Sequence, residues 1–364
     1  MEQTVRVELG RRSYDVRIGA GLLGQLGSAV ADVGEVRSAV VVTETTVGPL
    51  YAGRAVESLK SAGLSASAIE FPAGEVNKTL STFSRVIDAL FAVSPPIDRS
   101  TVLVALGGGV PGDLGGFVAA TALRGLRLFQ CPTSLLADVD ASVGGKTAVD
   151  HEVGKNLIGA FHQPVGVLID VATLRTLPPR ELAGGLAECV KHAVIRDAGL
   201  LEFIEDQADA LLAVAADVTT ELIARNVAIK AGVVAADERE SGERTHLNFG
   251  HTIGHAIEAR GGYGEVSHGE AVSLGMVAAC RLAVGRGLLE DEAAARVEEL
   301  LGRLALPVRR PGLDADEIWR IMQHDKKALG GQVRMVLPVM LGAVAIFDDI
   351  TPHAVRDAVA YLGG

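Results

Sequence analysis

The stretch TVLVALGGGVPGDLGGF, residues 101–117, decides the fold class of this chain. Residues 101–106 are mostly apolar and predict a buried strand, and three consecutive glycines follow them. Pro111 suits the first turn of a helix that begins after those glycines, because a helical N–H in that turn has no partner to lose. A strand, a glycine turn and a helix in this order are typical of parallel α/β sheets.

The rest of the first half repeats this alternation. Short runs rich in β-branched residues predict strands at 37–47, 65–71, 127–134 and 165–171, and helical patterns separate several of them. Residues 1–19 alternate polar and apolar side chains as a strand pair does. We therefore expect residues 1–177 to form an α/β domain with a parallel sheet and helices on both faces.

The second half has a different character. Most segments from residue 178 onward carry helical periodicity, and only QVRMVLPVMLGAVAIFD, residues 332–348, predicts a further strand pair. A chain of 364 residues is long for one ordinary domain and suits two. We expect the second, residues 178–364, to be mostly α-helical.

Composition excludes several classes of protein. The formal net charge of -11 argues against nucleic acid or an anionic membrane as the main partner. No apolar run reaches the roughly 18 residues that a membrane helix needs. Cys131, Cys189 and Cys280 lie far apart without a CxxC spacing, which predicts reduced, buried thiols in a cytoplasmic protein.

Two glycine motifs indicate possible phosphate sites. Gly107, Gly109 and Gly112 satisfy GxGxxG and could bring backbone N–H groups to a pyrophosphate, although at least two strand and helix units precede them, unlike a standard Rossmann order. An acidic residue suited to a ribose occurs earlier, at Glu44. The segment VGGKT, residues 143–147, fails the phosphate-loop pattern because Asp140 stands where that pattern needs glycine, so we reject an ATPase.

Residues 138–156 around that segment, DVDASVGGKTAVDHEVGKN, are predicted to form a polar loop between apolar segments. A solvated surface loop and a functional loop both fit this composition.

A histidine group supplies candidate metal ligands. His251 and His255 are four residues apart and share a helical face, but Thr252 excludes the HExxH motif of zinc proteases. His268 follows later in the chain, and Glu188 lies on an earlier helix. A zinc ion held by two of these imidazoles and the carboxylate would keep an open position for substrate. By spacing alone the metal site is only weakly indicated, because isolated histidines are more often packed or ordinary polar residues than ligands. Lys and Arg side chains are scattered over the same half of the chain. Solvated surface charges are the default interpretation of each, but gathered in one site they would suit a substrate that carries both a carboxylate and a phosphate.

The longer motifs carry a resemblance that spans nearly the whole chain. The chain resembles the 3-dehydroquinate synthase family of NAD-dependent sugar-phosphate cyclases in PAGEVNKTL, GGGVPGDLGGF, RGLRLFQCPTSLLADVDASVGGKTAVDHEVGKNLIGAFHQP, TLPPRELAGGLAECVKH, KAGVVAADERESGERTHLNFGHTIGHAIE, SHGEAVSLGM and HDKK. This resemblance implies an α/β NAD-binding domain at 1–177 and an α-helical metal- and substrate-binding domain at 178–364. It also implies a cytoplasmic homodimer.

The activity implied is conversion of 3-deoxy-D-arabino-heptulosonate 7-phosphate to 3-dehydroquinate and phosphate. The reaction would proceed in five steps: transient oxidation by NAD, phosphate elimination, re-reduction, ring opening and an intramolecular aldol closure. The enzyme would be a carbon-oxygen lyase of the shikimate pathway that forms precursors of aromatic amino acids.

The resemblance also implies roles for particular residues. A divalent metal, zinc or cobalt, would be held by Glu188, His251 and His268. The NAD site would use Glu44, Glu75, Lys78, Gly108, Gly109, Asp113, Thr133, Ser134 and Lys155, with the family more often having aspartate at 44 and threonine at 134. Substrate-binding residues would be Arg124, Asn156, Arg244 and one of Lys326 and Lys327, and the catalytic set Asp140, Lys146, Lys191, Lys230, Asn248 and His255. His192 and His246 receive no role.

Three alternatives remain open at this point. Another sugar-phosphate cyclase would act on a substrate without a carboxylate, and a metal-dependent polyol or glycerol-phosphate dehydrogenase would accumulate NADH. A non-catalytic relative would retain the fold and bind neither metal nor NAD.

Overall fold

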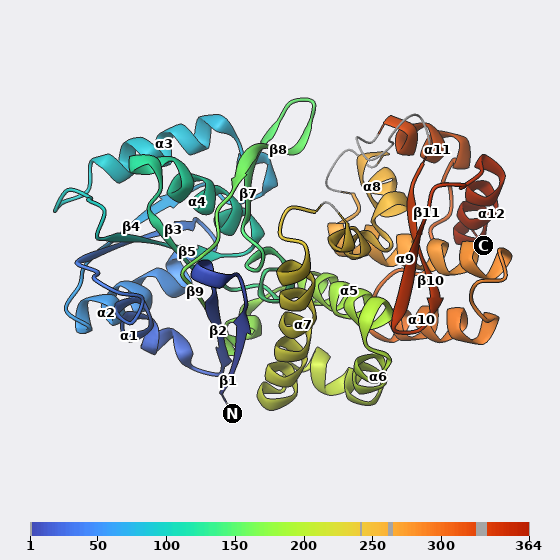
Figure 1. The fold of residues 1–364 in the computed structure, drawn as a ribbon, viewed down its shortest axis with the longest axis horizontal. Coiled ribbons are helices and arrows are strands. Elements are labelled where there is room, and N and C mark those ends of the chain that lie inside the picture. The colour runs from blue at the N-terminus through green and yellow to red at the C-terminus, as the bar shows by residue number, and fades with distance from the viewer. Residues whose placement is uncertain (1, 241, 261–264, 325–332, 364) are drawn as a thin grey trace. The chain divides into compact units, whose positions relative to one another are not determined.

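The computed structural model describes residues 2–240, 242–260, 265–324 and 333–363. The chain forms two compact units (Figure 1). The first comprises Met1–Leu177 and Val214–Arg239, and the second comprises Pro178–Ala213 and Glu240–Gly364.

A seven-stranded sheet forms the centre of the first unit, in the order β1-β2-β9-β6-β5-β3-β4. Its strands are β1 (Gln3–Val7), β2 (Tyr14–Gly19), β3 (Ser38–Glu44), β4 (Ser65–Phe71), β5 (Thr101–Gly107), β6 (Arg127–Pro132) and β9 (Gly166–Asp170). Every neighbouring pair is parallel except β1 with β2, which form the antiparallel hairpin expected at the N-terminus.

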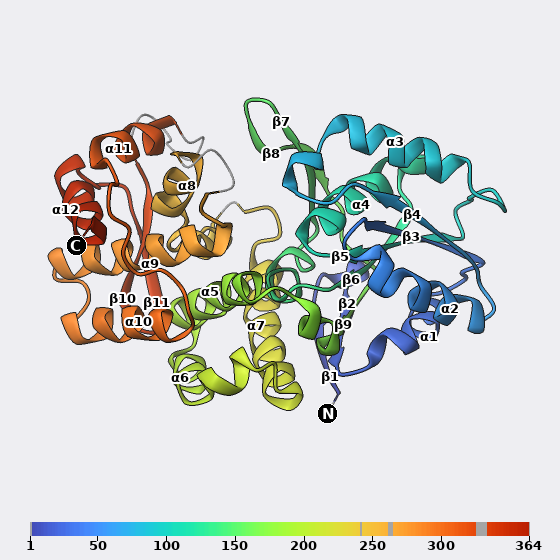
Figure 2. The same cartoon turned by 180° about the vertical axis from the view of Figure 1, so that it is seen from behind.

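The sheet is covered on both faces because its central strands β3 and β5 carry buried, mostly apolar side chains on both sides. Along β3, Ala39 and Val41 pack into the core beneath α1 (Leu26–Ala31) and α2 (Gly53–Ser61). Val40 and Val42 pack into the core beneath α3 (Leu80–Phe91) and α4 (Gly109–Thr121) on the opposite face (Figures 1 and 2). Continuous apolar strands of this kind are typical of parallel sheets. The predicted α/β arrangement is confirmed.

The strand order reverses between β3 and β5. From β3 the chain passes through α2 to β4 on one side, then returns through α3 to β5 on the other side of β3. In open α/β sheets, ligands bind outside the carboxyl ends of the strands at such a reversal.

Residues 138–156 do not form the predicted loop. A π-helical turn at Ala137–Ala141 is followed by the hairpin of β7 (Lys146–His151) and β8 (Gly154–Phe161). The polar pattern is misleading because part of the hairpin is not solvated: Thr147, Ala148 and Val149 are buried. Gly116 of α4 allows this contact, since a Cβ there would lie 2.4 Å from Thr147 Cγ2.

Helix α7 (Ala216–Ala236) belongs to the first unit, although the expected boundary at residue 178 placed it in the second. It packs against β1 and β2, and the Gln3 amide donates a hydrogen bond to Glu221 at 2.8 Å. The chain therefore leaves the first unit after Leu177 and returns to it for one helix.

The second unit is mostly helical, as predicted. Its helices are α5 (Pro179–Arg196), α6 (Ala198–Leu212), α8 (His251–Arg260), α9 (His268–Gly285), α10 (Asp291–Arg303), α11 (Ala315–His324) and α12 (Pro352–Gly363), accompanied by the expected strand pair β10 (Met335–Met340) and β11 (Ala343–Phe347). Helix α9 is buried along almost its whole length and packs against α5, α8, α10 and α12.

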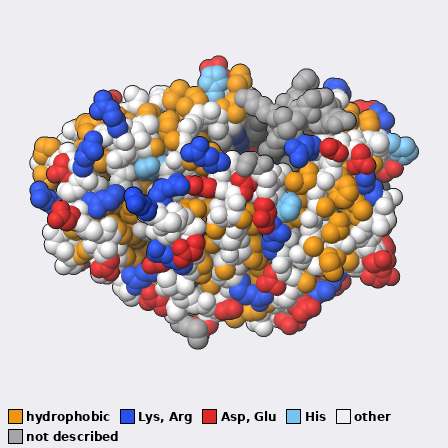
Figure 3. All heavy atoms as spheres, viewed as in Figure 1, with side chains coloured by type: hydrophobic (Ala, Val, Ile, Leu, Met, Phe, Trp, Pro, Cys, Tyr) orange, Lys and Arg blue, Asp and Glu red, His pale blue; other side chains and the backbone are white. Residues whose placement is uncertain are grey.

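The three cysteines are free and buried, as predicted. Among the described residues, no helix has the length and apolar character needed to span a membrane. Acidic and basic side chains are interspersed over the visible face (Figure 3), and many form surface ion pairs such as Arg296 with Glu205 at 2.6 Å.

Candidate functional site

Glycines allow three helices of the second unit to approach closely. A Cβ at Gly269 of α9 would lie 2.2 Å from Gly184 Cα of α5, and one at Gly254 of α8 would lie 2.8 Å from Ala271 O of α9. Side chains at these positions would force the backbones apart. The contacts therefore set the distances between the polar residues that α5, α8 and α9 carry.

Glu188 on α5, His251 on α8 and His268 on α9 converge as the resemblance implied. Glu188 Oε1 lies 3.2 Å from His268 Nε2 and 3.5 Å from His251 Nε2. One ligand atom from each residue lies within 4.8 Å of the other two, a spacing that could hold a metal ion. The Glu188 side chain is fully buried, so its carboxylate is held by these partners and by Lys191, which forms an ion pair with Oε2.

The second nitrogen of each imidazole is also engaged. His251 Nδ1 lies 3.0 Å from Phe249 O, and His268 Nδ1 lies 3.4 Å from Glu258 Oε2. The carbonyl can only accept, so Nδ1 of His251 carries the proton and Nε2 offers its lone pair. Two imidazoles oriented in this way with one carboxylate are a donor set typical of catalytic zinc sites.

The charges of the cluster are strongly coupled. Burial alone would raise the pKa of Glu188, but Lys191 and the two histidines hold that pKa well below its usual range. Burial lowers the pKa of His251. Burial acts the same way on His268, yet hydrogen bonds to Glu188 and Glu258 raise the pKa of His268 to about 10. The two imidazoles differ because a second carboxylate reaches only His268.

Other predicted residues of this unit lie on α5 and α8 or directly before α8. Lys191 is one turn after Glu188, and the His255 ring centroid lies 5.2 Å from that of His251. Asn248 follows the buried Arg244 in a short 3-10 helix, Glu243–Asn248, directly before α8. Lys326 and Lys327 lie outside the described residues.

Two acidic residues of this region were not predicted from the sequence. Glu240 accepts a hydrogen bond from Asn248 Nδ2 at 3.1 Å, and Glu258 contacts His268. Glu258 could have been found from its spacing, because it lies seven residues after His251 and therefore on the same helical face. His246, for which no role was predicted, lies 3.2 Å from Arg196 Nη2 through Nδ1, and His192 is fully buried on α5.

In the first unit, the predicted pyrophosphate residues meet at the carboxyl ends of β5 and β6. Gly107 and Pro132 are paired in the sheet, and Thr133 N donates to Gly107 O at 2.9 Å. A Cβ at Gly108 would lie 3.3 Å from Ser134 Oγ. Gly109 begins α4, and no side chain among the described residues caps its first turn. A helix N-terminus with exposed N–H groups is suited to phosphate.

A network of charges lies beside the first turn of α4. Lys78 Nζ is 2.6 Å from Asp113 Oδ2 and 3.8 Å from Glu75 Oε1, and it also donates to Asn156 Oδ1. Lys155 reaches Glu75 at 3.7 Å. Burial alone would lower the pKa of Lys78, but Asp113 and Glu75 raise it. The pKa of Asp113 is raised because burial outweighs Lys78. Four predicted NAD residues and one predicted substrate residue are thus brought together.

The remaining predicted residues of this unit are an ion pair, a strand-end carboxylate and two exposed cations. Lys230 on α7 donates to the Asp140 carbonyl and to Oδ1 of its carboxylate, the latter at 2.6 Å. Glu44 ends β3 and accepts from the backbone N–H groups of Thr46 at 2.6 Å and Val47 at 3.0 Å. Lys146 and Arg124 are exposed.

Arg124 and Asn156 share an uncommon backbone conformation. Their φ values of 62° and 58° lie in the left-handed region, which residues other than glycine and asparagine rarely adopt. At Arg124 this conformation is strained, and such strain collects at functional positions. Asparagine adopts it more readily, so Asn156 carries no comparable strain.

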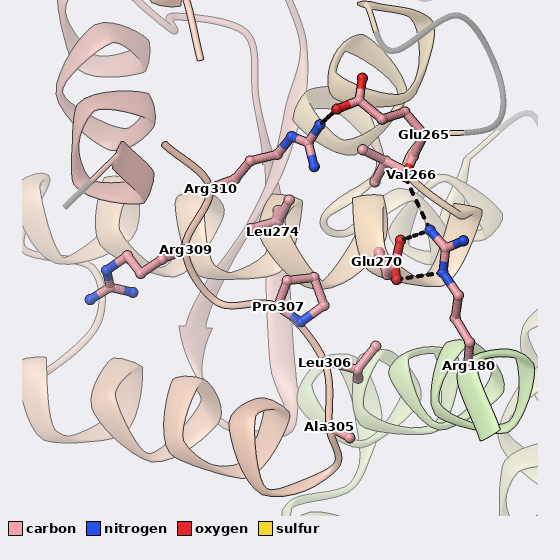
Figure 4. Close-up of a pocket in the computed structure, with 10 residues that line it drawn as sticks. All are labelled: Arg180, Glu265, Val266, Glu270, Leu274, Ala305, Leu306, Pro307, Arg309 and Arg310. Atoms are coloured by element: carbon pink, nitrogen blue, oxygen red, sulfur yellow. Dashed lines mark hydrogen bonds and ion pairs between the residues drawn. The ribbon is translucent and has the colours of Figure 1, made fainter. Parts of the chain in front are cut away.

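A cavity of about 440 Å³ in the second unit contains none of the predicted residues (Figure 4). Arg180 points at Glu270 and bonds both of its carboxylate oxygens, at 2.7 and 2.6 Å, while Arg310 points at Glu265 (Figure 4). Glu270 also completes the capping box of α9 with Ser267. The pair joins α5 to the first turn of α9, so we interpret these residues as structural support for His268.

Comparison with known families decides the assignment. Residues 68–184 match the family described as 3-dehydroquinate synthase N-terminal, and residues 185–328 match 3-dehydroquinate synthase C-terminal. The chain belongs to the 3-dehydroquinate synthase family. A curated relative named 3-dehydroquinate synthase, from Desulforamulus reducens, is 47% identical over 348 residues, covering 95% of this chain and 96% of the relative.

Solved structures of related synthases support the same fold for this member of the 3-dehydroquinate synthase family. ValA, a 2-epi-5-epi-valiolone synthase from Streptomyces hygroscopicus with NAD+ and Zn2+ bound, has a TM-score of 0.88 and is 30% identical, with 98% of this chain and 97% of that chain covered. A 2-deoxy-scyllo-inosose synthase complexed with carbaglucose-6-phosphate, NAD+ and Co2+ has a TM-score of 0.87 at 27% identity, with 98% and 99% covered. The predicted family and fold class are confirmed.

Proposed function

We propose that this protein converts 3-deoxy-D-arabino-heptulosonate 7-phosphate to 3-dehydroquinate and phosphate, as a carbon-oxygen lyase. The observation that carries the proposal is the convergence of Glu188, His251 and His268 in a chain 47% identical to a 3-dehydroquinate synthase. The relatives crystallised with NAD+ and with Zn2+ or Co2+ support the same cofactors here.

The residues fit both groups. The two Nε2 atoms face Glu188 while both Nδ1 atoms are engaged elsewhere, which suits a divalent ion with an open position. The uncapped start of α4 at the strand reversal suits the NAD pyrophosphate. When bound, the metal supplies Lewis acidity at a substrate hydroxyl, and NAD supplies a hydride acceptor that is regenerated within one turnover.

The chain's own residues would position these groups. Lys191 holds Glu188 Oε2, which leaves Oε1 directed at the histidines. Phe249 O keeps the proton of His251 on Nδ1. Lys78 neutralises Asp113 and, with Glu75 and Lys155, forms the polar edge of the NAD site. Glu44, Thr133 and Ser134 complete that site at the ends of β3 and β6.

Substrate contacts would divide by charge. Lys230 fixes the Asp140 carboxylate, which can then accept a hydrogen bond from a ring hydroxyl. Arg244 would pair with the substrate carboxylate, with Lys191 and Asn248 near the ring. Arg124, Lys146, Asn156, His255 and one of Lys326 and Lys327 would face the phosphate, whose departure needs cationic and hydrogen-bonding partners.

The related cyclases provide the nearest alternative, because ValA and 2-deoxy-scyllo-inosose synthase share the fold. A carboxylate on the substrate gives Arg244 a partner, so Arg244→Ala should raise the KM for the heptulosonate phosphate at least tenfold. An unchanged KM would remove the argument for this substrate.

The direct test is phosphate release from 3-deoxy-D-arabino-heptulosonate 7-phosphate, with NAD+ and zinc each omitted in turn. Release that requires both and yields 3-dehydroquinate without accumulated NADH supports the proposal. Stoichiometric NADH would favour a polyol or glycerol-phosphate dehydrogenase instead. Failure of the protein to bind either cofactor would indicate a non-catalytic relative.

Assembly and location follow as part of the same proposal. We infer a homodimer that works in the cytoplasm on a small-molecule substrate, with neither nucleic acid nor membrane as partner. Sedimentation at several protein concentrations tests the dimer.

A further inference from the structure

Glu258 is buried beside the candidate metal centre without being one of its three ligands. Its side chain is 8% exposed, and Oε2 lies 3.4 Å from His268 Nδ1. It comes from α8, whereas His268 begins α9. Burying a carboxylate is unfavourable unless it is paired, so its position calls for a partner of opposite charge or a hydrogen-bond donor. His268 Nδ1 is such a donor.

We propose that Glu258 is a positioning residue that orients His268 for metal binding. This inference rests on the proposed metal centre and adds a residue to it. A carboxylate at Nδ1 fixes the proton there, leaves Nε2, which faces Glu188 Oε1 at 3.2 Å, as the nitrogen that would bind a metal, and makes the imidazole a stronger ligand. Two orienting groups then serve the centre, a backbone carbonyl for His251 and a carboxylate for His268.

The location of Glu258 strengthens this assignment. His251 and Glu258 lie seven residues apart on one face of α8, so a single helix supplies one ligand and the support for the other. His268 is the first residue of α9, where no preceding turn of the helix restrains its ring. The His268 side chain is also more exposed than that of His251, at 33% against 12%. It therefore depends more on an external contact for its orientation.

The same contact gives a definite expectation for metal affinity. Loss of an outer-sphere partner of a ligating histidine typically weakens metal binding ten- to a hundredfold. Glutamine at 258 retains an oxygen that can accept from Nδ1, whereas alanine removes the acceptor altogether. We therefore expect zinc affinity to fall ten- to a hundredfold in Glu258→Ala and less than tenfold in Glu258→Gln.

The experiment is a zinc competition titration against a chromogenic chelator with the full-length chain. Wild type, Glu258→Ala, Glu258→Gln and Glu299→Ala would be compared; Glu299→Ala removes one exposed carboxylate from α10 in the same unit and should leave the affinity unchanged. The visible absorption spectrum of the cobalt-loaded protein should change in Glu258→Ala, because His268 would no longer be held in one orientation. A loss of packing alone would not change that spectrum.

The outcomes separate this inference from the proposed function. If wild type binds one zinc and Glu258→Ala binds it equally well, the positioning role is wrong and the metal centre stands. If wild type binds no zinc, both are wrong. If Glu258→Ala does not fold, Glu258→Gln decides: an affinity below one-tenth of wild type would show that retaining the acceptor does not preserve the site, which contradicts the orienting role.

Discussion

Replacement of Gly269 by alanine tests how the metal centre is assembled. The added Cβ would lie 2.2 Å from Gly184 Cα and 2.6 Å from Gly184 O, and both obstacles are backbone atoms of α5. Carbon atoms in contact normally lie about 3.5 Å or more apart, so α9 must move from α5 by roughly 1 Å. His268 follows Ser267 at the start of α9 and would move with it.

That displacement exceeds what a metal site tolerates. Glu188 Oε1 and His268 Nε2 are 3.2 Å apart, and metal-ligand distances are set to within roughly 0.2 Å. We expect zinc affinity to fall at least tenfold. Overpacking costs about 2 kcal/mol, the middle of its usual range, and the better helix propensity of alanine offsets up to about 1 kcal/mol of that cost. The free energy of unfolding of the metal-free protein should therefore decrease by about 1–2 kcal/mol.

The same contact offers a matched control. A Cβ on Gly184 would lie 3.6 Å from Gly269 Cα, which is an ordinary contact, so Gly184→Ala should retain zinc affinity and stability. Gly285→Ala, at the exposed end of α9 with nothing within 4 Å of the new Cβ, should be neutral or slightly stabilising. Denaturant unfolding and zinc competition measure both quantities. Equal effects of Gly269→Ala and Gly184→Ala would refute the reasoning, as would unchanged zinc binding in Gly269→Ala.

Two further predictions concern buried carboxylates. Glu188→Gln removes the anionic member of the candidate donor set, so elemental analysis should find much less zinc than in wild type, and an equal content would contradict the site. Asp138→Asn should stabilise the protein at pH 8, because Asp138 is fully buried, neither carboxyl oxygen has a hydrogen-bond partner among the described residues, and burial raises its pKa well above the usual value. The folded wild type retains this proton to higher pH than the unfolded chain, so wild-type stability falls as pH rises between the unfolded-state and folded-state pKa of Asp138. In denaturant unfolding, the advantage of Asp138→Asn should grow by about 1.4 kcal/mol per pH unit in this range and vanish near pH 4. A stability difference independent of pH would contradict this account.

The fold could be predicted from the sequence where a hydrophobic pattern is compatible with only one type of secondary structure and burial. Six mostly apolar residues followed by glycines at 101–109 fit a buried strand, and both faces of β5 are indeed covered. The hairpin of β7 and β8 was not predicted because polar residues flank its buried segment, residues 147–149, and a stretch of that composition also fits a loop. Helical periodicity predicted α7 but not the surface on which it packs, since an apolar face fits either unit.

The candidate site was less accessible to reasoning from residues alone. The spacing of His251 and His255 indicates a shared face, yet the partner of His251 is His268 on another helix, and spacing along the chain does not report that contact. The family resemblance supplied the ligands. The contacts of Lys78 with Asp113 and Asn156 likewise join residues that lie far apart in the sequence. They depend on where the hairpin of β7 and β8 packs, which the sequence pattern does not report.

The path of the chain through α7 constrains how the protein can be synthesised. Residues 178–213 of the second unit emerge from the ribosome before the helix that covers β1 and β2. Until residue 236 is made, the N-terminal hairpin lacks the complete helix that packs against it. The first unit therefore cannot complete its folding strictly in the order of translation, and a fragment ending at Leu177 would expose an apolar surface prone to aggregation. A separately expressed first unit would need α7 joined to it by a linker in place of residues 178–213.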